Sequence, residues 1–155
     1  MLKLYLHEVN IWLDVDVLEN LGDLENSVVE SAHFILFYSK GFFNSFNCRR
    51  EVMKAMEADK PMTIMFEPDD ISVDMIVQMQ TEFTKFWPQD LRQDEIESYI
   101  FGKVPIMWIS NGKQFSLESI KLVAGRLLND LPFYQKNPGL LDTCLKIKGE
   151  ATPVG

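Results

Sequence analysis

The sequence predicts an α/β protein with a parallel sheet and helices on both faces. Short apolar runs, each bounded by turn residues, are typical of buried strands. Four such runs are present: Asn10–Asp14, His33–Tyr38, Met62–Phe66 and Val104–Ile109. Segments with apolar residues at helical spacing separate them. Strands that alternate with helices pair in parallel, and right-handed crossovers between them place helices on both faces of the sheet.

Length, composition and charge narrow the classes of protein to consider. A chain of 155 residues, 46% hydrophobic and 25% charged, is typical of one ordinary globular domain. The net charge of −8 argues against non-specific binding to nucleic acid or to an anionic membrane. No apolar run reaches the roughly 18 residues of a membrane span. Cys48 and Cys144 form neither a disulfide framework nor a zinc pattern, so we expect reduced thiols and a cytoplasmic protein.

The N-terminal third is expected to contain two helices around the first strand. Residues 1–9 fit either an alternating strand or a helix, and the helix is favoured because it collects the apolar residues on one face. Asp16–Asp23 is an acidic loop with Gly22 as its flexible point, and we expect it to be the most mobile loop between regular elements. Asp23 is the expected N-cap of a helix that ends near Ser31.

The C-terminal half is expected to add three helices and a tail. Both His33–Tyr38 and Met62–Phe66 have apolar residues on both faces, so we expect them to be central neighbours in the sheet. The further elements are a helix from an Asp70 cap to Phe86 that Pro88 stops, a short helix over Asp90–Phe101, a helix from a Ser116 cap to Leu131, and a mostly irregular tail over 132–155. The predicted domain is therefore 1–131.

The stretch from His33 to Met56 holds the strongest candidate for chemistry. A buried strand is followed by a polar loop and then by a helix whose apolar stripe is Cys48, Val52, Ala55 and Met56. Glu51 lies at the edge of this stripe, within the first turn or so, where we expect it to be neither fully solvated nor buried in the core. Ligands bind outside the carboxyl ends of parallel strands, where such a helix begins. The alternative is an acidic residue that only complements the helix dipole.

The order of residues over about 60 positions resembles a TIR domain. The matching positions are Asp14, Gly22, Ser31, Ser39, Phe43, Ser45, Cys48 and Glu51. The resemblance implies a flavodoxin-like strand order, 2-1-3-4-5. A complete TIR domain begins with an additional strand before its first helix, so this chain resembles an N-terminally truncated one. Asn10–Asp14 is then left to lie beside His33–Tyr38, to pair with another strand or to remain unpaired.

The resemblance also implies an activity and a site. TIR-like enzymes cleave NAD between nicotinamide and ribose, giving ADP-ribose or a cyclic variant, with NAD as substrate and with no cofactor or metal. Glu51 takes the catalytic position, and the NAD-binding positions are Asp14, Ser39, Phe43, Asn47 and Cys48. Asn47 stands where the family commonly has Trp, so Phe43 or Phe46 is expected to supply an aromatic wall instead.

Other functions remain open from the sequence. The second hypothesis is a non-enzymatic TIR adaptor in signal transduction that assembles with other TIR-like domains, as a homo-oligomer, through the Asp16–Asp23 loop. The third is a nucleotide-binding or regulatory α/β domain, or one without activity. Among single residues, Cys48 fits a core position better than a nucleophile, and His33 fits a structural role. A metal site at Asp14, Asp16, Glu67 and Asp69 is conceivable, but the spacing does not require it.

Overall fold

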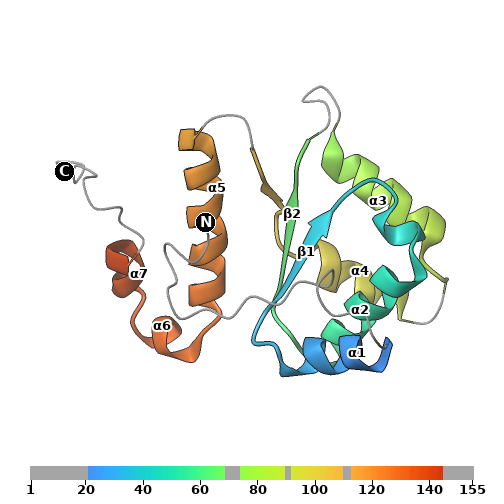
Figure 1. The fold of residues 1–155 in the computed structure, drawn as a ribbon, viewed down its shortest axis with the longest axis horizontal. Helices are drawn as coiled ribbons and strands as arrows, with labels where there is room; N and C mark the ends of the chain where they lie inside the picture. Colours follow the sequence, from blue (N-terminus) through green and yellow to red (C-terminus); the bar gives the residue numbers. More distant parts are fainter. Residues whose placement is uncertain (1–20, 69–73, 90–91, 110–112, 145–155) are drawn as a thin grey trace.

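The computed structural model describes residues 21–68, 74–89, 92–109 and 113–144 (Figure 1). Within them, three parallel strands form one sheet in the order β1 (Phe34–Tyr38), β2 (Met62–Phe66) and β3 (Ile106–Met107). In register, Phe34 lies opposite Met62, and Met65 lies opposite Ile106. The predicted α/β class with a parallel sheet is confirmed. The expected helix over 1–9, the strand Asn10–Asp14 and residues 16–20 of the acidic loop lie outside the described residues.

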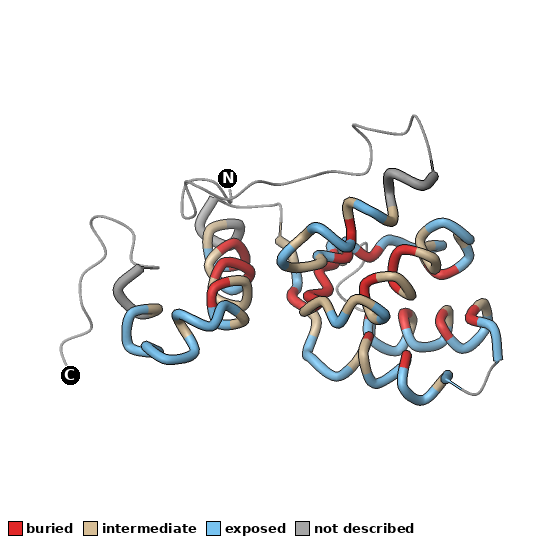
Figure 2. Tube along the Cα trace, turned by 90° about the horizontal axis from the view of Figure 1, so that it is seen from below, coloured by how far each residue is buried: buried red, intermediate tan, exposed pale blue. Residues whose placement is uncertain are grey.

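Helices cover both faces of the sheet, as Figure 1 shows. One face carries α2 (Phe46–Glu57), α3 (Met75–Phe86) and α4 (Gln93–Phe101), with α1 (Leu21–Glu30) packed against α2. The other face carries α5 (Lys113–Asn129). The arrangement is consistent with a flavodoxin-like fold, and in Figure 2 the buried residues line the inner sides of these helices.

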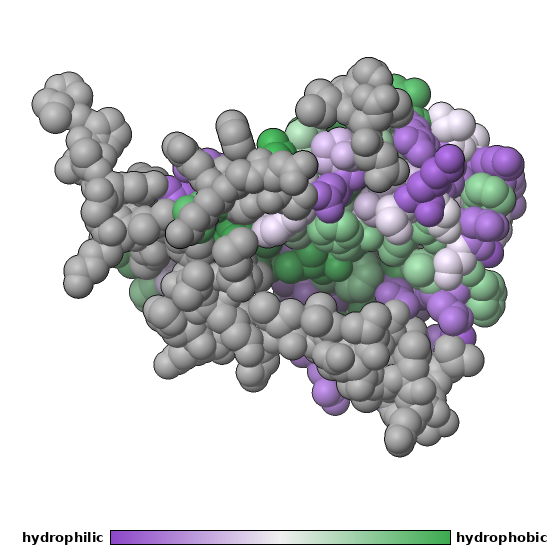
Figure 3. Space-filling view, turned by 45° about the horizontal axis from the view of Figure 1, so that its top comes forward, coloured by the Kyte–Doolittle hydropathy of each residue, from purple (hydrophilic) through white to green (hydrophobic). Residues whose placement is uncertain are grey.

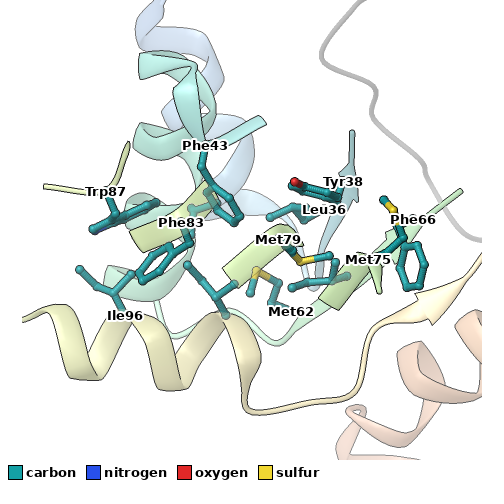
Figure 4. Close-up of a cluster of buried hydrophobic side chains, with 13 residues drawn as sticks. Leu36, Tyr38, Phe43, Met62, Phe66, Met75, Met79, Phe83, Trp87 and Ile96 are labelled. Carbon is teal, nitrogen blue, oxygen red and sulfur yellow. The ribbon is translucent and has the colours of Figure 1, made fainter. Parts of the chain in front are cut away.

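The larger core lies between the sheet and α2, α3 and α4 (Figure 4). Alternate strand residues point into it, as the period of two in a strand requires: Leu36, Tyr38, Met62, Ile64 and Phe66. From the helices come residues that include Val52, Met79, Phe83, Trp87 and Ile96. A smaller core of Met65, Ile106 and Val123 packs under α5.

Strand β1 is more exposed than β2. β2 is buried at all five positions, whereas Ile35 and Phe37 of β1 are 36% and 48% exposed. Within the described residues β1 pairs only with β2, and the strand Asn10–Asp14 that could pair with its other edge lies outside them, so its expected central place stays a prediction. The two strands are neighbours, as expected. The apolar face of β1 that points away from the larger core is therefore only partly covered.

Several predicted boundaries move for local reasons. α1 begins at Leu21, so Asp23 lies inside it and is not its N-cap. α3 begins at Met75, and Asp74 is its cap, because Asp74 Oδ1 accepts from the amides of Ile76 and Val77. The cap expected at Asp70 is thus wrong, while the stop before Pro88 is confirmed.

The C-terminal elements also differ from expectation. β3 is only two residues long, within the expected Val104–Ile109, and it starts directly after Pro105, which has no amide hydrogen to pair. α5 begins at Lys113, so Ser116 lies inside the helix and does not cap it. The expected irregular tail contains α6 (Pro132–Lys136) and α7 (Gly139–Cys144), which both contact α5.

Candidate functional site

A pocket of about 310 Å³ opens at the carboxyl ends of β1 and β2. Its position is where open parallel sheets bind their ligands. The volume is at the lower end of the usual range for small-molecule sites, which is about 300 to 1,000 Å³. The lining comes from the end of β1, from the segment after β2 and from the start of α3: Phe37, Tyr38, Ser39, Lys40, Glu67, Pro68 and Met75.

The pocket combines charged and aromatic groups at its rim. Lys40 and Glu67 are both exposed, and the Phe37 side chain is 48% exposed. An ammonium group binds phosphate, a carboxylate accepts from ribose hydroxyls, and an exposed ring offers a stacking surface. These groups suit a ligand that has phosphate, sugar and a flat ring together.

The loop after β1 has a fixed backbone conformation. Gly41 has a φ of 93°, in the left-handed region that residues with a Cβ rarely adopt. A single 3₁₀ turn, η3 (Phe42–Asn44), follows, with the Asn44 amide donating to the Gly41 carbonyl at 3.1 Å. Ser45 then caps α2, and its hydroxyl accepts from the Cys48 amide at 3.4 Å. The loop thus runs directly from the pocket into α2.

Side chains from α3 and α2 hold this loop. The Glu82 carboxylate accepts from the Tyr38 hydroxyl at 2.9 Å, from the Gly41 amide at 2.9 Å and from the Phe43 amide at 2.8 Å. Arg49 donates to the carbonyls of Phe43 and Asn44 from the other side. Burial first, and then the hydrogen bond to Glu82, raise the pKa of Tyr38, which therefore stays a neutral donor.

Glu51 lies in the second turn of α2, because this helix begins at Phe46. The residue is 9% exposed, so it is more buried than its position at the edge of the stripe indicates. Besides the sheet, both α1 and α4 contact α2, so this helix is covered on more than one side. Glutamate is seldom this buried, which distinguishes Glu51 from the exposed Glu57 at the end of the same helix.

The structure separates the other candidate residues. Ser39 lines the pocket. Phe43 is fully buried among aromatic rings that include Phe83 and Trp87, so it faces the core and not the pocket. Asn47 is exposed and Cys48 is half-buried, both in the first turn of α2. Asp14 lies outside the described residues. Of these candidates within the described residues, only Ser39 lines the pocket.

His33 belongs to a separate polar cluster beside the first residue of β1. Its Nε2 lies 2.9 Å from the Thr63 hydroxyl, and its Nδ1 lies 3.3 Å from Asp130 Oδ2 without hydrogen-bond geometry. Burial lowers the pKa of His33 to about 4, against the opposing effect of Asp130. Thr63 is fully buried, so this Thr-His-Asp arrangement cannot reach a substrate, in line with the structural role expected for His33.

In the described part of the chain, no group of three or more His, Cys, Asp or Glu side chains is arranged to hold a metal ion. Three of the four acids considered for such a site, Asp14, Asp16 and Asp69, lie outside that part. No helix there is long and apolar enough to cross a bilayer. Neither a scan against protein-family models nor a search of curated proteins finds a match to the chain.

Sequence reasoning missed Glu82 and most of the pocket lining. Glu82 lies 39 to 44 residues from its three donors, and nothing in the helical pattern of α3 distinguishes it from a solvated glutamate. Lys40 and Glu67 could have been found, because both follow directly after strands whose carboxyl ends meet at one edge.

Proposed function

We propose that this chain is a TIR-like NAD hydrolase that cleaves the bond between nicotinamide and ribose. The observation that carries the proposal is the buried carboxylate of Glu51, on the helix that leads away from the pocket at the carboxyl ends of β1 and β2. The TIR-like order of residues from Ser39 to Glu51 supports the same assignment.

The chemistry suits a single carboxylate. In NAD the nicotinamide ring is a cationic pyridinium, and it leaves as a neutral pyridine when the bond to ribose breaks. No strong general acid is therefore needed. The ribose then acquires oxocarbenium character, as in glycoside cleavage. A fixed negative charge on Glu51 stabilises that transition state, and its low exposure keeps water from weakening the interaction. Water takes the ADP-ribosyl group, or the adenine does so in a cyclic product.

In the chain, the first turn of α2 lies between the loop that lines the pocket and Glu51. Cys48 precedes Glu51 by three residues, so the two lie on the same side of the helix, one turn apart. In the proposed complex, NAD binds across the pocket with its phosphates near Lys40, and its ribosyl-nicotinamide end reaches over the start of α2. Asn47 and Cys48 then border the path to Glu51.

The deciding experiment is an assay for nicotinamide release from NAD by the purified full chain, with product analysis for linear and cyclic ADP-ribose. Steady release that depends on enzyme concentration supports the hydrolase. A folded chain that releases no nicotinamide at any protein concentration contradicts it.

A second candidate is the adaptor that assembles with other copies of the domain. The observation in its favour is the exposed apolar side of β1, with Ile35 and Phe37 at 36% and 48%. Hydrophobic surface is also visible beside hydrophilic residues in the space-filling view of Figure 3. Exposed apolar patches mark protein contacts. Light scattering across a range of concentrations, with a Phe37→Lys variant for comparison, separates an assembling adaptor from a monomeric enzyme.

A further inference from the structure

Glu82 makes an unusual set of contacts for a residue on the outer part of a helix. It is half-buried, and both of its carboxylate oxygens are used. Oε2 accepts from the Tyr38 hydroxyl and from the Gly41 amide, both at 2.9 Å, while Oε1 accepts from the Phe43 amide at 2.8 Å. Hydrogen bonds to an ionised acceptor are among the stronger ones in proteins.

In the chain, the three donors flank two of the residues that line the pocket. Tyr38 ends β1, and Gly41 and Phe43 follow within five residues. Ser39 and Lys40, which line the pocket, lie between the first and second donors. Fixing the donors therefore fixes the backbone that presents the Ser39 hydroxyl and the Lys40 ammonium group.

The same helix forms another wall of the pocket. Met75, at the start of α3, lines it, and Glu82 follows seven residues later on the same side of the helix. Glu82 thus ties the loop after β1 to the helix that carries Met75. The loop also ends in Ser45, the cap of α2. The position of the loop therefore determines where α2 starts and where Glu51 lies.

We propose that Glu82 is a positioning residue for the ligand site: its carboxylate holds the loop from Ser39 to Ser45 in the conformation that binds NAD. The identity of the ligand rests on the function proposed above. Glu82 does not line the pocket, so it acts through the loop and not on the substrate. The aromatic cluster around Phe43 anchors one side of this loop, and the Glu82 carboxylate joins the Gly41 turn to α3.

The test is Glu82→Gln, compared with Glu97→Gln as a charge-matched control. A glutamine offers one acceptor oxygen, and its amide group opposes a donor where the second oxygen was, so one loop hydrogen bond is lost. Glu97 is exposed on α4 and lies outside the pocket. We expect amide hydrogen exchange at Gly41 and Phe43 to become roughly 10-fold faster or more in Glu82→Gln, with no change at Ile64 of β2. The control should match the wild type at all three.

The kinetic readout distinguishes positioning from general stability. We expect the KM for NAD to rise roughly 10-fold in Glu82→Gln, with a smaller fall in kcat, and Glu82→Asp to recover part of the loss because it keeps the charge and both oxygens. Unchanged exchange at Gly41 and Phe43 overturns the proposal, and so does a loss confined to kcat. Faster exchange throughout the sheet overturns it as well, since Glu82 would then support the fold as a whole. If Glu82→Gln does not fold, Glu82→Asp decides by the same measurements.

The two proposals fail in different ways. A wild-type chain that releases no nicotinamide contradicts the hydrolase. Glu82 is then decided by hydrogen exchange alone, and a difference between Glu82→Gln and Glu97→Gln at the two loop amides supports its role in holding the pocket wall. Normal nicotinamide release in Glu82→Gln, with an unchanged KM, contradicts the Glu82 proposal and leaves the hydrolase in place.

Discussion

His33, which precedes β1, and Asp130, which follows α5, lie side by side with Nδ1 3.3 Å from Oδ2. The Asp130 carboxylate also accepts from Lys103 Nζ at 3.2 Å, and the other ring nitrogen of His33 lies 2.9 Å from the Thr63 hydroxyl. These contacts join the C-terminal end of α5 to the start of β1 and to the face of β2 that α5 covers. His33 is thus a buried group that gains a proton in mild acid only at a cost to the fold.

The stability of the fold should fall as the pH drops from about 6.5 to about 4. Burial, opposed by Asp130 and reinforced by Lys103 and Arg126, lowers the pKa of His33 from 6.5 to about 4. Between these values the unfolded chain binds a proton that the folded chain does not, so acid favours unfolding. At about 1.4 kcal/mol per pKa unit, the difference between 6.5 and about 4 corresponds to a loss of about 3–4 kcal/mol, which is complete below the folded-state pKa. Urea unfolding across this pH range measures it.

The control for His33 is His33→Gln, which keeps a polar group near Thr63 but does not titrate. Carboxylates elsewhere also weaken the fold in acid, so the informative quantity is the difference in pH slope between the two proteins. The variant should be less stable than the wild type at neutral pH and should depend less on pH above about 4. Parallel slopes for the two proteins would show that His33 does not contribute.

Gly41→Ala should destabilise the fold by about 1–2 kcal/mol, because the residue has a φ of 93° and L residues with a Cβ are strained there. An added Cβ at Gly41 would meet nothing within 4 Å, so the cost is one of backbone conformation alone. Gly139 is the matched control: its added Cβ also meets nothing, and its φ lies outside the left-handed region. Thermal unfolding of both variants checks the prediction, and equal melting temperatures would contradict it.

Phe43→Ala and Phe46→Ala should affect different properties: the first should lower stability, and the second should weaken NAD binding. Phe43 is fully buried and packs edge-on against Phe83 and Trp87, so its loss should cost about 3–5 kcal/mol of stability. Phe46 is 65% exposed in the first turn of α2, so its loss should change stability by no more than about 0.5 kcal/mol. If Phe46 supplies the aromatic wall for NAD, Phe46→Ala raises the KM. An unchanged KM removes Phe46 from the site.

The sequence was a good guide where one local pattern decides the outcome. The strand β2 has its predicted bounds because a run of four apolar residues and Thr63 is preceded by a proline and followed by a polar segment. Helix starts were less predictable, because several residues near a helix start can serve as its N-cap, and only the hydrogen-bond geometry of the backbone amides selects one of them. Asp70 and Asp74 both precede the apolar stripe of α3, and the amides of Ile76 and Val77 are bonded to Asp74.

Parts of the candidate site depend on contacts between distant segments, which periodicity does not reveal. The stripe of α2 gives the direction of the Glu51 side chain but not which neighbours cover it, and α1 and α4 both contact this helix. The resemblance placed Phe43 at the ligand, yet Phe83 of α3 and Trp87 pack against its ring. The role of Glu82 was hidden for the same reason, because its hydrogen-bond donors lie in a different segment of the chain.

Glu51→Gln should remove most NAD cleavage while the chain stays folded. The substitution keeps the shape of the side chain and removes its charge, and loss of such an electrostatic contact typically lowers kcat by on the order of 10² to 10³. Because Glu51 is buried in the second turn of α2, its charge contributes little through the helix dipole, which acts mainly in the first turn. The measurements are nicotinamide release and circular dichroism on the same preparations.

The control for Glu51 lies in the same helix. Glu57 ends α2, its side chain is 46% exposed, and its contacts to Lys54 and Arg92 are long, at 3.9 Å. Exposed pairs of this kind contribute little, so Glu57→Gln should retain wild-type cleavage and stability. Equal losses in the two variants would mean that the charge of α2 as a whole matters and not Glu51. Full cleavage in Glu51→Gln would remove Glu51 from the mechanism and leave the carboxylate at the pocket rim, Glu67, as the next residue to substitute.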